Sequence, residues 1–249
     1  MNTSPEIQKK YKKSFEHSYA LGPFPLFELL YTRPEAALRV WMDEEFNDCD
    51  KLSQLCLEKG IAFSYSKKVL QRISDKEICF AAGAFQKYTD TLSVSCSHVV
   101  LVNPSDMGNI GTIFRTALGF GIHDIAVISP AADHFNPKCV RASMGAVFKL
   151  RVAVFDSFEE YQAQYSQNRS FFPFMLEGGQ NLTMDSCPAV SVYSLIFGNE
   201  ASGLSAEFQK TGTPFFIPQT DEVDSLNLSV AAGIGIYLFT QKNAGRNRT

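Results

Sequence analysis

The 249-residue sequence contains no apolar run that is long enough to cross a bilayer. Its most apolar windows, such as SVAAGIGIYLF, fall well short of the roughly 20 residues that a spanning helix needs. The first residues, MNTSPEIQKKYKKSF, are polar and basic and lack the apolar centre of a signal peptide. We therefore expect a cytoplasmic protein with no membrane partner.

Metal-binding patterns are also missing. The six cysteines and four histidines are scattered, without a CxxC pair and without the spacing of a zinc site. We expect reduced, mostly buried thiols and no bound metal.

The chain has no excess of positive charge. Its formal net charge is −3, which is not the overall balance of a typical nucleic-acid-binding protein. Any contact with RNA must then come from local basic patches, such as Lys9–Lys13 or the GRNR segment near the C-terminus. Solvated, frayed chain ends would explain the same residues.

Signatures of common nucleotide-binding and hydrolytic folds are absent. There is no GxGxxG after a predicted strand, no GxxxxGK[ST] and no GxSxG. Their absence disfavours a dinucleotide-binding enzyme, a P-loop enzyme and an α/β-hydrolase.

What the sequence does contain is two segments with different patterns, joined by the polar stretch 86–97. Residues 16–85 alternate predicted helices and short strands, as in a small α/β unit. After the polar stretch, apolar β-branched runs such as HVVLV alternate regularly with helical patterns. This alternation predicts a mostly parallel sheet with helices on both faces. We predict an N-terminal domain of residues 1–95 and a second domain of residues 96–249.

Three predicted strands of the second domain end in polar loops. NPSDMGNIGTIFR contains the loop after HVVLV, GNEASGLS follows SLIF, and PQTDEVDSLNLS follows FFI. Ligands of parallel sheets bind beyond the C-terminal ends of the strands. We therefore expect the three loops to gather at one edge of the sheet and to form a site there.

These loops also resemble the three sequence motifs of the SpoU (TrmH) family of RNA ribose 2′-O-methyltransferases, within the SPOUT class. The matching stretches are NPSDMGNIGTIFRTALGFGI, IFGNEASGLS and IPQTDEVDSLNLSVAAGIGIYLF, which occur in the family's order. VRASMGAVFKLRV is similar to a further family segment. The resemblance covers essentially all of residues 99–240. The N-terminal part resembles, less strongly, the ribosomal-protein-like domain that binds substrate RNA in many members.

The resemblance implies a specific fold and activity. The fold would be an α/β domain whose C-terminal segment forms a trefoil knot, and the knot would bind S-adenosylmethionine. The protein would be a homodimer that methylates a ribose 2′-hydroxyl in structured RNA. The extra N-terminal domain favours rRNA over tRNA, because the family's tRNA enzymes often lack it.

The resemblance also assigns residues by motif position. The implied catalytic residues are Asn109, Arg115, Glu200, Ser225 and Asn227. The backbone around three residues would hold the adenosyl part of the cofactor: Gly198, Ile217 and Leu226. Three arginines are candidates for RNA binding, namely Arg141, placed near a predicted helix start beside the site, and Arg33 and Arg39.

Each catalytic candidate has a simpler structural explanation. Asn109 could cap a helix, and Arg115 could be a surface charge on an amphipathic helix. Glu200 could merely solvate a loop. Ser225 and Asn227 could form the N-cap and first turn of the last helix. His98 and His123 match no motif and are expected to be ordinary structural residues.

An arginine in the catalytic set poses a chemical problem, because arginine keeps its proton in nearly all protein settings. We expect Arg115 to activate the 2′-hydroxyl by stabilising negative charge or by gripping the adjacent phosphate. A phosphate oxygen or a guanidinium of lowered pKa would take the proton.

The alternative function is an RNA-binding protein that keeps the SPOUT fold but is catalytically silent.

Overall fold

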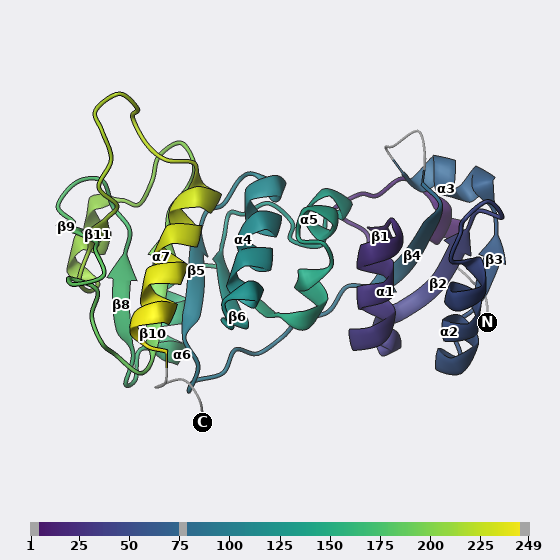
Figure 1. Ribbon diagram of the computed structural model, residues 1–249, viewed down its shortest axis with the longest axis horizontal. Coiled ribbons are helices and arrows are strands. Elements are labelled where there is room, and N and C mark those ends of the chain that lie inside the picture. The colour runs from purple at the N-terminus through teal and green to yellow at the C-terminus, as the bar shows by residue number, and fades with distance from the viewer. Residues whose placement is uncertain (1–4, 75–78, 245–249) are drawn as a thin grey trace. The chain divides into compact units, whose positions relative to one another are not determined.

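The computed structural model describes residues 5–74 and 79–244, which form two compact units (Figure 1). Unit 1 comprises Met1–Tyr88 and Asp133–Lys149, and unit 2 comprises Thr89–Ala132 and Leu150–Thr249. The chain thus passes from unit 1 to unit 2 inside the polar stretch 86–97, as residues 89–97 belong to unit 2. The GRNR segment lies outside the described residues.

Unit 1 is built on a four-stranded sheet with the order β1-β4-β2-β3. Strand β4 runs antiparallel to β1 and β2, and β3 runs parallel to β2. The strands are β1 (His17–Leu21), β2 (Ala37–Met42), β3 (Phe63–Tyr65) and β4 (Ala81–Gln86). The helices are α1 (Pro23–Thr32), α2 (Cys49–Lys59), α3 (Lys67–Ile73) and α5 (Pro137–Ala142), with the 3-10 turns η1 (Pro5–Gln8), η2 (Pro34–Ala36) and η3 (Ala146–Lys149).

Local sequence signals set the limits of these helices. Helix α2 ends at Gly60, whose φ of 68° is the left-handed conformation that glycine adopts without steric cost. Helix α3 begins after Ser66, whose side chain accepts a hydrogen bond from the backbone N–H of Val69.

Strand β1 carried no recognisable sequence signal, because it starts with two polar residues. His17 and Ser18 are nevertheless buried, and the Ser18 hydroxyl donates to the carbonyl of Phe135.

Residues 133–149 pack within unit 1 through aromatic contacts. The ring of Phe85 meets the rings of Phe135 and Phe148 edge-on. The sequence pattern of SMGAVFKL predicts a helix that starts at Ser143, but the segment forms only the 3-10 turn η3. Helix α5 ends at Ala142 instead, and Met144 and Gly145 have φ angles of 52° and 80°, which no right-handed helix can contain.

Unit 2 contains a five-stranded sheet in which every pairing is parallel, in the order β7-β6-β5-β10-β8. The strands are β5 (His98–Val102), β6 (Asp124–Ile128), β7 (Arg151–Phe155), β8 (Ser170–Pro173) and β10 (Tyr193–Phe197). The helices are α4 (Met107–Gly119), α6 (Phe158–Tyr165) and α7 (Leu228–Lys242), with the 3-10 turn η4 (Ala206–Lys210). The predicted parallel sheet is confirmed.

Helices cover both faces of this sheet (Figure 1). Helix α6 packs through Tyr161 and its neighbours on Val100, Ala126 and Ile196. Helices α4 and α7 contact each other, and Phe239 of α7 packs on Tyr193 of β10. The predicted two-sided α/β architecture is therefore confirmed.

The predicted strand FFI is shorter than expected and does not join the main sheet. Strand β11 (Phe215–Phe216) pairs in parallel with β9 (Gln180–Asn181) to form a separate two-stranded sheet. Pro214 and Pro218 flank it, and proline has no N–H to continue a ladder.

No helix in the described part of the chain has both the length and the apolar character that a bilayer crossing requires. Among the same residues, no group of three His, Cys, Asp or Glu side chains is placed to hold a metal ion. The six cysteines are free thiols, of which Cys56, Cys139 and Cys187 are buried.

A buried polar network secures the start of β5, at the N-terminal edge of the sheet. His98 is fully buried and lies 2.9 Å from the Tyr161 hydroxyl and 2.8 Å from the Ser93 carbonyl through its two ring nitrogens. Arg169 donates to the carbonyls of Tyr193 and Cys96 at 3.0 and 2.8 Å. The network makes His98 a structural residue, as expected from the sequence.

This network predicts a loss of stability in mild acid. Burial and the charge of Arg169 lower the pKa of His98 to about 4. An unfolded histidine takes up its proton near pH 6.5, whereas the folded one does so only near pH 4. The free energy of unfolding should therefore fall as the pH drops from about 6.5 to about 4, by up to about 3 kcal/mol from this group.

Urea unfolding of the wild type, His98→Asn and His123→Asn across this pH range measures the effect. The variant at His98 should show a flatter pH dependence than the wild type. The variant at exposed His123 should keep the wild-type slope. Parallel slopes for all three proteins would contradict the assignment.

Candidate functional site

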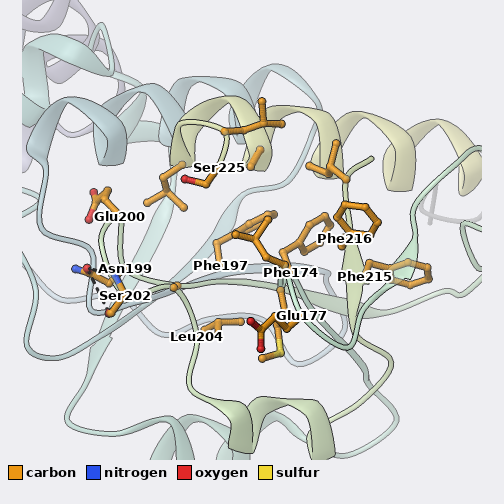
Figure 2. Close-up of a pocket in the computed structure, with 18 of the residues that line it drawn as sticks. Phe174, Glu177, Phe197, Asn199, Glu200, Ser202, Leu204, Phe215, Phe216 and Ser225 are labelled. Atoms are coloured by element: carbon orange, nitrogen blue, oxygen red, sulfur yellow. Dashed lines mark hydrogen bonds between the residues drawn. The ribbon is translucent and has the colours of Figure 1, made fainter. Parts of the chain in front are cut away.

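A cavity of about 410 Å³ lies in unit 2, beyond the C-terminal ends of β8 and β10 (Figure 2). The residues that line it come from four stretches, which are 174–177, 197–206, 215–219 and 225–231, together with Gln209. Aromatic side chains form much of its wall: Phe174, Phe197, Phe215 and Phe216. The second and third motif loops therefore meet at one edge of the sheet, as predicted.

The wall of the cavity depends on a close approach of two backbone segments after β10. Asn199 and Gly203 pair through two backbone hydrogen bonds, of 3.2 and 2.9 Å. A Cβ atom on Gly198 would lie only 2.2 Å from the carbonyl carbon of Gly203. Residue 198 must therefore be glycine for the loop to fold back in this way.

Several predicted residues do line this cavity. Gly198, Ile217 and Leu226, assigned to the adenosyl group, all do so. Two of the catalytic candidates, Glu200 and Ser225, do so as well. The cavity thus contains every predicted cofactor residue, although their role stays a prediction.

Glu200 ties the second motif loop to the first. Its carboxylate accepts hydrogen bonds from the Ser105 hydroxyl at 2.7 Å and from the Ser105 N–H at 3.0 Å. It also accepts from the Asp106 N–H at 3.0 Å and from the Asn109 side-chain amide at 3.2 Å. The interpretation of Glu200 as a mere solvating residue is therefore wrong.

The donors around Glu200 determine its protonation state. Partial burial alone would raise its pKa, but the hydrogen bonds from Ser105 and Asp106 outweigh this effect and lower the pKa to about 2. The carboxylate is consequently ionised throughout the physiological pH range. Such a weak base is poorly suited to removing a hydroxyl proton, so Glu200 holds the loops in place.

Asn109 and Asn227 connect the first motif to the third. The side-chain amide of Asn227 donates to the side-chain oxygen of Asn109 at 3.1 Å. Asn227 also caps α7, because its oxygen accepts from the Ser229 N–H at 2.8 Å. The N-cap of α7 is therefore Asn227, and the expectation that Ser225 caps the helix is wrong, because Ser225 lies two residues before the cap.

The capping explanation is wrong for Asn109. Helix α4 is capped by Asp106, whose carboxylate accepts from the Asn109 backbone N–H at 2.7 Å. The Asn109 side chain is therefore available to bridge Glu200 and Asn227. A continuous hydrogen-bonded chain, Glu200–Asn109–Asn227, links all three motif loops.

Arg115 does not join this chain of hydrogen bonds. It is exposed on α4, on the side that also carries Gly108 and Thr112, and it does not line the cavity. Within the described part of the chain it forms no hydrogen bond or ion pair. Its position within its own chain agrees with the surface-charge alternative.

The three RNA-binding candidates all lie in unit 1. Arg33 donates to the Phe148 carbonyl at 3.2 Å and stacks over the Tyr88 ring at 4.5 Å. The Nε atom of Arg39 is buried and has no hydrogen-bond partner among the described residues. Arg141 lies in the last turn of α5, not at a helix start, and lines a pocket of about 90 Å³ with Lys10 and Lys138.

Sequence reasoning missed several residues that build the site. Ser105 and Asp106 provide three of the donors to Glu200, and Asn199 donates from its side chain to the Asn103 carbonyl at 2.8 Å. One signal was present, because an aspartate just before a helical pattern is a common N-cap. The convergence of Ser105 on Glu200 had no signal in either loop.

The fold and the site together define an α/β protein whose ligand cavity is built by loops at the C-terminal edge of a parallel sheet. A model of the SpoU rRNA Methylase family matches residues 97–237, which is more than half of the chain. The chain belongs to the SpoU rRNA methylase family.

Known relatives support this membership. The chain is 26% identical over 184 residues to a 23S rRNA (guanosine(2553)-2'-O)-methyltransferase of Bacillus subtilis, which covers 73% of each chain. It is 31% identical over 157 residues to a 23S rRNA (uridine(2479)-2'-O)-methyltransferase of Streptomyces viridochromogenes, covering 61% of this chain and 55% of that one. The chain spans 73% of the length of the Bacillus subtilis relative but only 27% of that of a further curated relative, a ribosomal RNA small subunit methyltransferase of Syntrophobacter fumaroxidans.

A solved structure shares the fold over most of the chain. The AdoMet-bound rRNA methyltransferase of Sinorhizobium meliloti superposes with a TM-score of 0.78 at 24% identity, covering 91% of this chain and 87% of that one. The likeness extends the shared fold beyond the segment that the family model matches.

Proposed function

We propose that the protein transfers a methyl group from S-adenosylmethionine to a ribose 2′-hydroxyl of structured RNA, with rRNA favoured over tRNA. The observation that carries the proposal is the Glu200–Asn109–Asn227 chain of hydrogen bonds at a 410 Å³ cavity. Relatives named as 23S rRNA 2'-O-methyltransferases support the substrate class.

The cavity fits the cofactor in size and in chemistry. Its volume lies within the roughly 300–1,000 Å³ of small-molecule sites. Phe174 and Phe197 offer apolar surface to an adenine ring, and the backbone at Gly198, Ile217 and Leu226 would hold the adenosyl group. When bound there, S-adenosylmethionine supplies an electrophilic methyl group on its sulfonium.

The residues of the chain divide the remaining tasks. Ser225 and Asn227 would orient the ribose at the mouth of the cavity, and ionised Glu200 keeps Asn109 in position. Arg115 would stabilise negative charge on the 2′-oxygen or grip the neighbouring phosphate. The proton would leave to a phosphate oxygen or to a guanidinium of lowered pKa.

We also propose that the protein is a homodimer that associates through α4 and α7. These helices contact each other, and α7 exposes Tyr237 (46%) and Val230 (49%), while Phe120 at the C-cap of α4 is 39% exposed. A dimer would cover this surface. It would also let Arg115 act on the site of the second chain, which would explain its absence from the cavity of its own chain.

A trefoil knot in the C-terminal segment is a further part of the proposal. Membership of the SpoU family supports it, and the segment before β11 passes close to β8, because a Cβ atom on Gly212 would lie 2.1 Å from the carbonyl oxygen of Phe171. Unit 1 would bind the substrate RNA through its three candidate arginines, Arg33, Arg39 and Arg141. A cytoplasmic location would give such an enzyme access to rRNA.

Two measurements test the function. S-adenosylmethionine and its demethylated product should raise the melting temperature, whereas NAD and ATP should not. With labelled cofactor, the protein should then label rRNA from a strain that lacks it, at ribose 2′-oxygens. Label on a base would contradict the reaction. Cofactor binding without transfer to rRNA or tRNA would favour the catalytically silent alternative.

A further inference from the structure

Two of the residues that line the cavity carry a charge, Glu177 and Glu200, and both are acidic. The Glu200 carboxylate is already occupied by its donors from the first motif loop. The Glu177 carboxylate, in contrast, forms no hydrogen bond or ion pair with any residue in the described ranges. Figure 2 shows Glu177 well away from Glu200 and Ser225. Among the described residues, the cavity therefore has one charged acceptor without a protein partner, on the exposed side chain of Glu177.

The turn that carries Glu177 is held rigidly against β11. The Met175 N–H donates to the Phe215 carbonyl, and the Gln180 N–H donates to the Pro214 carbonyl, each at 2.9 Å. A Cβ atom on Gly179 would lie 2.8 Å from the carbonyl carbon of Phe215, so the backbones touch there. The backbone that carries Glu177 is consequently fixed before any ligand binds, which reduces the entropic cost of ordering the turn.

The position of Glu177 indicates which part of a cofactor it meets. The transferred methyl must face the Glu200–Asn109–Asn227 chain, where the substrate ribose would lie. The sulfonium and its neighbouring atoms belong at that end of the cavity. Glu177 lies away from it, on a side of the cavity that the rest of the cofactor would reach. The vicinal hydroxyls of a ribose form a pair of donors that one carboxylate can accept together, as acidic residues do in dinucleotide-binding folds.

We propose that the Glu177 carboxylate accepts hydrogen bonds from the 2′- and 3′-hydroxyls of the cofactor's ribose and so selects ribonucleoside ligands. The proposal rests on the proposed function, because it assumes that the cavity binds S-adenosylmethionine. Glu177 is a binding residue in this role and takes no part in the transfer itself.

Calorimetry with three ligands tests the proposal on the full chain. S-adenosylmethionine, S-adenosylhomocysteine and 5′-methylthioadenosine share the ribose diol but differ in the sulfonium and the amino-acid part. Glu177→Ala should weaken all three by a similar factor, about ten- to a hundred-fold, as expected for hydrogen bonds to a charged group. Glu177→Gln, which keeps one acceptor oxygen, should lower the affinity for the three ligands less than Glu177→Ala does. If the alanine variant does not fold, the glutamine variant provides the test.

Two controls make the result specific. Glu207→Gln removes the same charge from an exposed position of η4 that does not line the cavity, and it should bind all three ligands as the wild type does. 5′-Methylthio-2′-deoxyadenosine lacks one hydroxyl of the diol. The wild type should bind this deoxy ligand more weakly than it binds 5′-methylthioadenosine. Glu177→Ala should weaken binding of the deoxy ligand much less than it weakens binding of 5′-methylthioadenosine.

The other outcomes overturn the proposal in distinct ways. A loss confined to S-adenosylmethionine would place Glu177 at the sulfonium. A loss that spares only 5′-methylthioadenosine would place it at the amino-acid part. An equal loss for the deoxy ligand would place it at the base, and no loss would remove it from the site. A wild type that binds none of the ligands would instead contradict the proposed function.

Discussion

Replacing Arg115 by alanine is expected to lower methyl transfer to RNA by at least about a hundred-fold while leaving cofactor affinity nearly unchanged. Removing one group that stabilises developing negative charge commonly costs this much in rate. Cofactor affinity should persist, because Arg115 does not line the cavity and forms no hydrogen bond or ion pair with the described residues. Single-turnover transfer and calorimetry with S-adenosylmethionine measure the two effects separately.

Two further variants define what Arg115 contributes. Arg115→Lys keeps the positive charge but loses the planar pair of donors, so it should recover only part of the rate if the guanidinium grips a phosphate. Lys210→Ala removes another exposed cation of unit 2 and should have little effect. If Arg115→Ala lowered cofactor affinity as much as transfer, Arg115 would support the cavity and not the reaction.

Replacing Gly198 by alanine is expected to abolish detectable cofactor binding and, with it, methyl transfer. The new Cβ would lie 2.2 and 2.4 Å from the carbonyl carbon and oxygen of Gly203 and 2.5 Å from the Leu204 nitrogen. These are backbone atoms, so the loop has to open, and Glu200 moves with it. Overpacking of this kind also costs about 1–3 kcal/mol of stability.

A matched substitution separates the loop effect from a general effect of alanine. Gly119, in the last turn of α4, has open space around the position of a Cβ atom. Gly119→Ala should therefore bind the cofactor as the wild type does and be as stable or slightly more stable. Thermal melting and calorimetry on both variants give the comparison. Wild-type affinity in Gly198→Ala would show that the cofactor does not use this loop.

The sheet of unit 2 was predictable because its strands are short apolar runs between clear helical patterns. The place of the site followed from the rule for parallel sheets, and the three loops did converge. Strand β11 was overestimated, since its apolar letters say nothing about which partner is within reach. Strand β1 was missed because the burial of His17 and Ser18 depends on partners far away in sequence.

The identity of the site residues was more predictable than their contacts. Asn109 and Asn227 have the same side chain near the start of a helix, yet only Asn227 acts as a cap. Asp106 occupies the cap of α4, which leaves Asn109 free for the bridge. Likewise, nothing in the loop sequence indicated that four donors converge on Glu200, because that contact depends on how two distant loops are brought together.

The bridging contacts of the site have a consequence for the growing chain. Ser105 and Glu200 are 95 residues apart, and Asn109 and Asn227 are 118 residues apart. Long-range contacts of this kind form late, because loop closure must come first. During synthesis α7 leaves the ribosome after every other element that builds the site, so the site can be completed only once α7 has been made. A nascent fragment that stops before α7 therefore cannot form the site.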